Sequence, residues 1–313
     1  MKRYLVLLGI AVIVLALAGC GDGAGNGAEN GGDGPDAVIT VDLGGGVSIT
    51  MNWIENGSFQ MGDPDSGNIN YAKPQHSVTL TKGYYMGIHL VTQEQWRTVM
   101  AGSDNNIDPS GFINGAGDGE DQAKRPVECV TWYDTIEFCN ILSEKTGLES
   151  VYTITGIERN FLDQIETATV TADWDKNGFR LPTEAEWEYA CRAGTTTHWS
   201  FGNTSSGIGS YVWYDYNSGN KTHQVGMKTA NAWGLYDMHG NVWERCWDWF
   251  DYYTGEAKND PTGPDEPNMD YGIYRVIRGG GWDSGALSTR SAYRYELNPS
   301  LRSWATGFRV VLR

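Results

Sequence analysis

The sequence predicts an α+β domain with much irregular backbone. Helix-capping signals open three short helical patterns, at residues 92–100, 131–144 and 182–193. Most other apolar residues fall in short runs that end at turn residues, which is typical of strands. The 41 glycines and the Gly- and Asn-rich stretches at 101–123 and 202–222 indicate long loops.

Each predicted helix has a defined start and stop. Thr92 precedes Gln95, and Thr183 precedes Glu186, at the spacing of a capping box, in which side chains satisfy the free backbone amides of the first turn. Thr131 can cap the longer middle helix in the same way. A glycine follows the end of each pattern, where the helix is expected to stop.

The predicted strands lie before, between and after these helices. Residues 49–62 alternate around Asn56-Gly57, which predicts a β-hairpin. Residues 76–87 have the pattern of a strand, a turn and a second strand. Residues 275–280 and 307–313 predict the last strands of the domain.

The first 36 residues predict an export signal and a tether. Residues 1–19 have two basic residues and then an apolar run, as a signal peptide does. They lead into Cys20 through small residues, a pattern that resembles the bacterial lipobox and predicts lipidation of Cys20; the alternative is a plain cleaved signal with a stray cysteine. Residues 20–36 form the lipidated cysteine and a Gly-rich linker, and residues 37–313 form one domain. We therefore expect an exported, membrane-anchored bacterial lipoprotein at the cell surface, on the outer membrane.

The chain is acidic, with 23 Lys and Arg against 39 Asp and Glu and a formal net charge of −16. Removal of the predicted signal peptide would delete Lys2 and Arg3 and leave 21 bases against 39 acids, a net charge of −18. Nucleic-acid binding depends on bases that neutralise phosphates, and anionic lipid headgroups also attract bases. We therefore expect no nucleic-acid partner, and contact with the membrane only through the lipid anchor.

The cysteines and histidines give no sign of a metal centre. Cys129, Cys139, Cys191 and Cys246 lie in no metal-ligand spacing. Cys139 and Cys191 follow apolar helical stripes, which predicts buried thiols. The five histidines are scattered, without an i, i+4 pair. The sequence therefore predicts that no cofactor is required.

Several blocks, in order, resemble one family. They include GSFQMG at 57–62, FRLPTEAEWEYACRAG at 179–194, and VGMKTANAWGLYDMHGNVWERCWDWF at 225–250. With RVIRGGGWDS and GFRVV near the end, they look like the formylglycine-generating-enzyme, or sulfatase-modifying-factor, family. The resemblance covers nearly all of residues 48–313 and implies the C-type lectin fold of that family. Arg180, Arg278 and Arg309 are expected to be structural, paired with carboxylates or loop carbonyls.

The resemblance also allows the family's chemistry to be tested. Enzymes of this family resemble one another in placing two cysteines just after an Arg-Gly-Gly motif, where thiolates suit copper(I). This chain has Ser284 and Ser288 in that region and no cysteine after Cys246. We therefore predict a protein that is not an enzyme. The alternative is a sulfatase-modifying, formylglycine-generating oxidase or a relative that acts on sulfur substrates.

The C-terminal region, residues 275–313, resembles the variable region of proteins that retroelements diversify, of the treponemal type. In that class a fixed frame surrounds positions that change, and we expect the frame here to include Arg278, Trp282, Arg290 and Arg294. The resemblance implies a surface-displayed protein, expected to be a monomer, that binds a protein or glycan ligand. The alternative is an undiversified binding module, with the same aromatic residues in its core or rim. The predicted variable positions are Asp283, Ser284, Gly285, Ser288, Tyr293, Tyr295, Glu296, Leu297, Asn298, Ser300, Leu301, Ser303, Trp304 and Ala305.

One short segment could hold a structural calcium ion. GLYDMHGNVWE offers the carboxylates of Asp237 and Glu244 and the carbonyls of Gly240 and Val242, which are hard oxygen ligands. The resemblance implies a calcium site at these positions. The alternative is that the two acids accept hydrogen bonds in a turn.

Overall fold

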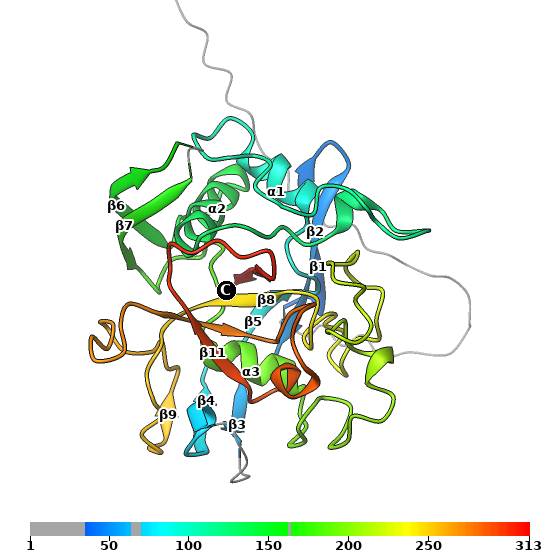
Figure 1. The fold of residues 1–313 in the computed structure, drawn as a ribbon. Coiled ribbons are helices and arrows are strands. Elements are labelled where there is room, and N and C mark those ends of the chain that lie inside the picture. Colours follow the sequence, from blue (N-terminus) through cyan, green and yellow to red (C-terminus); the bar gives the residue numbers. More distant parts are fainter. Residues whose placement is uncertain (1–34, 64–69, 162–163) are drawn as a thin grey trace, which may run out of the picture.

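The computed structural model describes residues 35–63, 70–161 and 164–313 (Figure 1). The predicted signal peptide, Cys20 and most of the linker lie outside the described residues. The α+β prediction is confirmed, since three helices accompany several small sheets. The helices are α1 (Gln93–Met100), α2 (Trp132–Lys145) and α3 (Glu184–Arg192). No helix in the described part of the chain is long and apolar enough to cross a membrane.

The first sheet joins the two ends of the domain, with strand order β1-β2-β5-β13. β5 pairs antiparallel with β2 on one side and with β13 on the other. The predicted hairpin at Asn56-Gly57 is wrong, because β2 pairs with β1 and β5 while β3 pairs with β4 in another sheet. Pairing with distant strands outweighs the local turn signal. The strands are β1 (Val38–Gly44), β2 (Val47–Ile54), β5 (Tyr84–Gly87) and β13 (Val311–Leu312).

The second sheet carries the C-terminal region, with order β11-β10-β8-β12. β10 lies between β8 and β11 and is antiparallel to both, whereas β12 runs parallel to β8. Figure 1 shows these orange and red segments beside β8 in the middle of the molecule, with α3 next to β11. The strands are β8 (Trp243–Trp249), β10 (Arg275–Arg278), β11 (Arg294–Leu297) and β12 (Thr306–Gly307).

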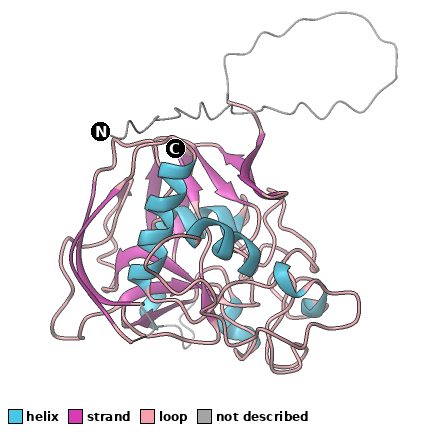
Figure 2. Ribbon diagram, turned by 90° about the horizontal axis from the view of Figure 1, so that it is seen from above, coloured by secondary structure: helices cyan, strands magenta, loops and turns pink. Residues whose placement is uncertain are grey.

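Two smaller sheets contain the remaining strands of the described residues. One has the order β3-β4-β9, and the other is a hairpin of β6 and β7, which the sequence analysis did not predict. Loops and turns still make up much of the backbone, as predicted (Figure 2). The strands are β3 (Gly57–Met61), β4 (His76–Leu80), β9 (Lys258–Asn259), β6 (Tyr152–Arg159) and β7 (Ile165–Ala172).

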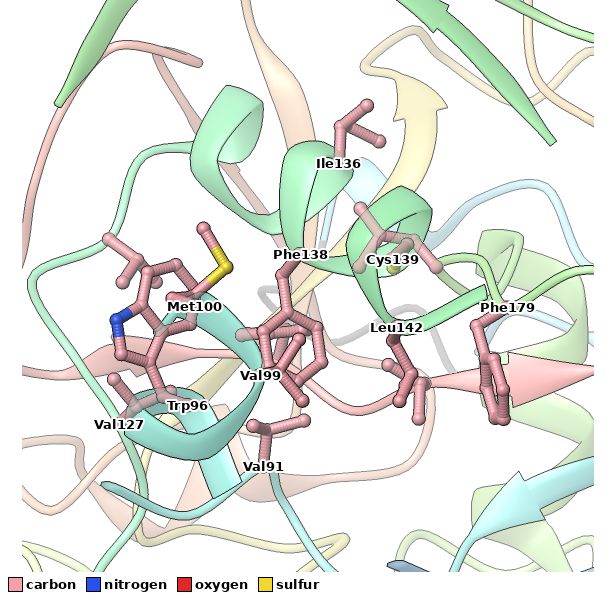
Figure 3. Close-up of a cluster of buried hydrophobic side chains, with 14 of the residues drawn as sticks. Val91, Trp96, Val99, Met100, Val127, Ile136, Phe138, Cys139, Leu142 and Phe179 are labelled. Carbon is pink, nitrogen blue, oxygen red and sulfur yellow. The ribbon is translucent and has the colours of Figure 1, made fainter. Parts of the chain in front are cut away.

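Capping and aromatic packing fix the helices. All three predicted N-caps are present, each with a full capping box, at Thr92, Thr131 and Thr183. One core lies between α1 and α2, where the rings of Trp96 and Phe138 stack with centroids 5.4 Å apart (Figure 3). A second core lies around α3, β4, β8 and β10. Burial of these large rings stabilises a domain with little regular structure.

Candidate functional site

Buried ion pairs connect α3 with distant arginines. Three glutamates of α3 each meet a guanidinium. Glu184 binds Arg294 of β11 through both oxygens, at 2.7 and 2.6 Å. Glu186 binds Arg180, at 2.7 Å on each oxygen, and Glu188 binds Arg278. Such bidentate pairs fix geometry as well as charge. The C-terminal frame is thus anchored to a capped helix.

Arg278 holds the backbone of the predicted variable region directly. Its side chain is fully buried and donates to the carbonyls of Ser291, Ala292 and Tyr293 at 2.9, 3.0 and 2.9 Å. The prediction that Arg278 is structural, pairing with a carboxylate and loop carbonyls, is therefore confirmed. Because this arginine fixes main-chain atoms, the side chain of Tyr293 is not needed to hold the loop.

The predicted variable positions are largely solvent-accessible, while most frame residues are buried. Tyr295, Leu301 and Trp304 are 44, 53 and 59% exposed. Asp283 and Gly285 are exposed, and the remaining predicted variable positions except Ala305 are half-buried. Frame residues such as Arg294 and those of the 307–311 segment are buried. A side chain that leaves the core can change without changing the fold.

Ala305 is the exception, and its assignment to the exposed surface is wrong. It is 5% exposed, and its carbonyl accepts from the Trp243 amide at 2.7 Å, beside the β8–β12 pairing. A residue between packed strands has no room for larger side chains. Leu287, which the sequence analysis left out of the variable positions, is 58% exposed.

The exposed aromatic residues gather around Trp243. The ring of Trp243 lies 6.0 Å from those of Tyr293 and Tyr295. The neighbouring Glu296 raises the pKa of Tyr295, and burial raises the pKa of Glu296 itself. These rings and the partly desolvated carboxylate of the adjacent residue provide large contact area together with hydrogen-bond acceptors.

Trp304 extends the surface toward another part of the chain. Its ring lies 5.6 Å from that of Phe112 and packs over the backbone of Gly111. Trp282 donates through Nε1 to the carbonyl of Trp304 at 3.0 Å, so a frame side chain holds the backbone beneath an exposed ring. Phe112 also contacts Trp282, with ring centroids 5.5 Å apart.

Sequence reasoning missed the residues that other segments bring to this surface. Tyr71, Phe112 and the pair Trp243 and Tyr252 come from three separate parts of the sequence. Tyr71 and Tyr252 pack together with ring centroids 5.8 Å apart. Glu296 raises the pKa of Tyr71, so these two side chains lie near each other. No local pattern marks these residues, because only the tertiary structure assembles them.

The thiols are placed for packing. Cys129, Cys139, Cys191 and Cys246 are free and buried, which confirms the prediction for Cys139 and Cys191. Burial raises the pKa of Cys191 to about 12 and raises that of the other three thiols as well. Neutral thiols are poor nucleophiles and poor metal ligands. Near the Arg-Gly-Gly motif, the hydroxyl oxygen of Ser284 accepts from the Gly281 amide at 3.0 Å.

The predicted calcium ligands do not fit a site that includes Glu244. Both oxygens of this fully buried carboxylate are bound by Arg309, at 2.5 and 2.8 Å, so Glu244 is the counter-ion of a buried guanidinium. Asp237 accepts from the Gly226 amide at 2.8 Å, and burial raises its pKa to about 6. Gly240 and Val242 lie in the turn between the two acids. Within residues 35–63, 70–161 and 164–313, no group of three His, Cys, Asp or Glu could hold a metal ion.

Comparison with known proteins identifies the family. The profile of the sulfatase-modifying factor enzyme 1-like domain (FGE-sulfatase) matches residues 48–313. The chain belongs to this family. Among curated members and relatives, this FGE-sulfatase domain is 34% identical over 287 residues to the chaperone protein LppX of Paenibacillus barcinonensis, covering 85% of this chain and 90% of that one. It is 37% identical over 159 residues to the formylglycine-generating enzyme of Streptomyces coelicolor, covering 45% of this chain and 48% of that enzyme.

A solved structure of the FGE-sulfatase type is similar over most of the chain. Treponema denticola variable protein 1 matches with a TM-score of 0.79 and 38% identity, covering 89% of this chain and 100% of that one. The predicted C-type lectin fold of the formylglycine-generating-enzyme type is thereby confirmed, as is the resemblance to a treponemal variable protein. The FGE-sulfatase family includes enzymes, among them the formylglycine-generating enzyme of Streptomyces coelicolor.

Proposed function

We propose that this protein is a surface-displayed lipoprotein that binds a macromolecular ligand through its C-terminal surface, and that a retroelement diversifies this surface. The proposal rests on a difference in burial within residues 278–311. Most frame residues are buried, whereas every predicted variable position except Ala305 is exposed or half-buried. The similarity to Treponema denticola variable protein 1 supports the same conclusion.

The chemistry of the surface favours a protein ligand, with glycan as a second class. Tyr293, Tyr295, Leu301 and Trp304 supply aromatic and aliphatic area, and tyrosine and tryptophan dominate the energetics of protein interfaces. Serine and asparagine neighbours supply adaptable hydrogen bonds. Binding is non-covalent and shallow, and lipidation of Cys20 would hold the monomer on the outer membrane, in reach of ligands outside the cell.

The alternative function is the family's oxidation of a sulfatase cysteine to formylglycine. It needs a pair of thiolates for copper(I) after the Arg-Gly-Gly motif, where this chain has Ser284 and Ser288. We therefore infer that the protein is not an enzyme and requires no cofactor. Oxygen uptake with a cysteine-containing sulfatase peptide and copper would establish the alternative.

Alanine substitutions distinguish side chains of the proposed binding surface from side chains of the core. Tyr295→Ala and Trp304→Ala are each expected to change the free energy of unfolding by about 1 kcal/mol or less, since both side chains are about half exposed. Phe308→Ala, a fully buried control, should cost about 3–5 kcal/mol. Denaturant titrations measure all three. A ligand captured by the wild-type protein should be lost from the two surface variants. If they unfold as readily as the control, these rings belong to the core and the proposal fails.

A further inference from the structure

A cavity lies between the N-terminus of α3, the end of β8 and the loop 251–264. It has a volume of about 460 Å³, and none of the predicted variable positions lines it. Ligand sites for small molecules have volumes of this order. Its walls include Glu184, Asp248, Trp249, Tyr252 and Tyr253.

Asp248 is the buried acid of this cavity that forms no ion pair in the described part of the chain. Its side chain is 4% exposed, and its Oδ2 accepts from the Glu184 amide at 2.7 Å. Among the described residues, nothing donates a hydrogen bond to the other oxygen, Oδ1. Gly263, with a φ of +76°, brings the backbone against the Asp248 side chain, so the loop covers this carboxyl. Burial, with a further contribution from Glu184, raises the pKa of Asp248 to about 8.

The nearby cations are engaged elsewhere. Arg294 gives two of its nitrogens to Glu184, and its third, Nη1, donates to the carbonyls of Tyr71 and Asp251 at 3.1 and 2.6 Å. Lys258 is half exposed and lies 3.5 Å from Glu256. The lining acids outnumber the lining bases, since Asp251 and Asp260 also face the cavity. Arg275 also acts on Asp248 electrostatically, but its guanidinium lies over the ring of Trp249 at 3.3 Å. In the described part of the chain Asp248 forms no salt bridge, so a bound cation would stabilise the ionised form of this buried carboxyl.

Aromatic rings complete the recognition chemistry. Trp249, Tyr252 and Tyr253 line the same cavity as Asp248. The faces of such rings attract cations, most strongly where water is excluded. An ammonium group can donate to a carboxylate oxygen while its methylene chain packs on the rings. A neutral polyol would leave the ionised carboxylate uncompensated.

We propose that this cavity binds a primary ammonium group, carried by a diamine or by a lysine side chain, with Asp248 as its counter-ion. The cavity and the C-terminal surface share no variable position, although Tyr252 borders both. Calorimetric titration of the full-length protein with 1,5-diaminopentane and with Nα-acetyl-lysine methylamide tests the proposal and tells the two sources apart. 1,5-Pentanediol, of similar length and without charge, is the control ligand.

We expect at least one of the two amines to bind and the diol not to bind. Asp248→Asn should weaken amine binding at least tenfold, whereas Glu256→Gln, which removes an equal charge from an exposed side chain, should leave it unchanged. Equal binding of the diol, unchanged amine binding in Asp248→Asn, or no binding of either amine at 10 mM would overturn the proposal.

The pH dependence of the wild-type protein gives a test that requires no variant. Glu184, Glu186, Arg294 and Arg275 act on Asp248 electrostatically. The other ionisable groups that line the cavity are His76, Asp251, Tyr252, Tyr253, Lys258 and Asp260. Because the ammonium binds the ionised carboxylate, its affinity should rise about tenfold per pH unit between pH 6 and the pKa of Asp248, and then level off. A flat profile from pH 6 to 9 would contradict the assignment, as would a slope that persists in Asp248→Asn.

Discussion

Replacing Arg278 with alanine is expected to lower the free energy of unfolding by about 3–5 kcal/mol. The substitution leaves Glu188 buried with Arg192 as its one remaining guanidinium partner. It also removes the donors to the carbonyls of Ser291, Ala292 and Tyr293, and a buried carbonyl without a donor costs free energy. Since those carbonyls belong to the frame of the C-terminal surface, this region should lose order first.

Chemical denaturation and amide hydrogen exchange measure the two effects. Arg97→Ala is the matched control, because Arg97 pairs with Asp108 while its side chain is 45% exposed. It should change the free energy of unfolding by less than about 1 kcal/mol. An Arg278→Ala protein with the stability of the control, and with unchanged exchange in residues 286–300, would show that the frame does not depend on this arginine.

Replacing Arg309 with leucine should have a similar effect, about 3–5 kcal/mol, for a simpler reason. Arg309 and Glu244 are both fully buried, and each oxygen of Glu244 is bound by Arg309. The single variant leaves Glu244 as an uncompensated buried charge. The double variant Arg309→Leu/Glu244→Leu removes that charge, so it should be more stable than Arg309→Leu alone.

A double-mutant cycle measures this coupling from four unfolding curves. We expect the two single substitutions together to cost more than the double substitution does. Additive costs would mean that the two side chains do not act as a pair. In that case Glu244 would have a role outside the pair, such as ion binding.

The helices could be predicted because their signals are local. Thr92, Thr131 and Thr183 cap their own first turns through contacts within a few residues, and the structure confirms each of them. The strand pairing could not be predicted in this way. Asn56-Gly57 has the composition of a hairpin turn, yet β2 lies in the sheet of β1 and β5, and β3 lies in the sheet of β4 and β9. Long-range packing decides such cases.

The candidate site could be predicted only as far as it is continuous in the sequence. The accessible positions between 283 and 304 follow from the alternation of frame residues and variable positions. The prediction for Ala305 is wrong because its backbone pairs with Trp243 and the residue is buried. Phe112 and Tyr71 reach the surface from distant loops. The cavity at Asp248 likewise depends on residues from Met61 to Arg294, which only the folded chain brings together.

The most direct test of the central claim is to sequence the 3′ end of the gene, with its flanking DNA, in many isolates. Diversification predicts substitutions at adenines in codons for the accessible positions between 283 and 304, and unchanged codons for Arg278, Arg294 and Arg309. It also predicts a nearby template copy beside a reverse-transcriptase gene. Identical sequences in every isolate, or changes spread equally over frame and surface, would contradict the account.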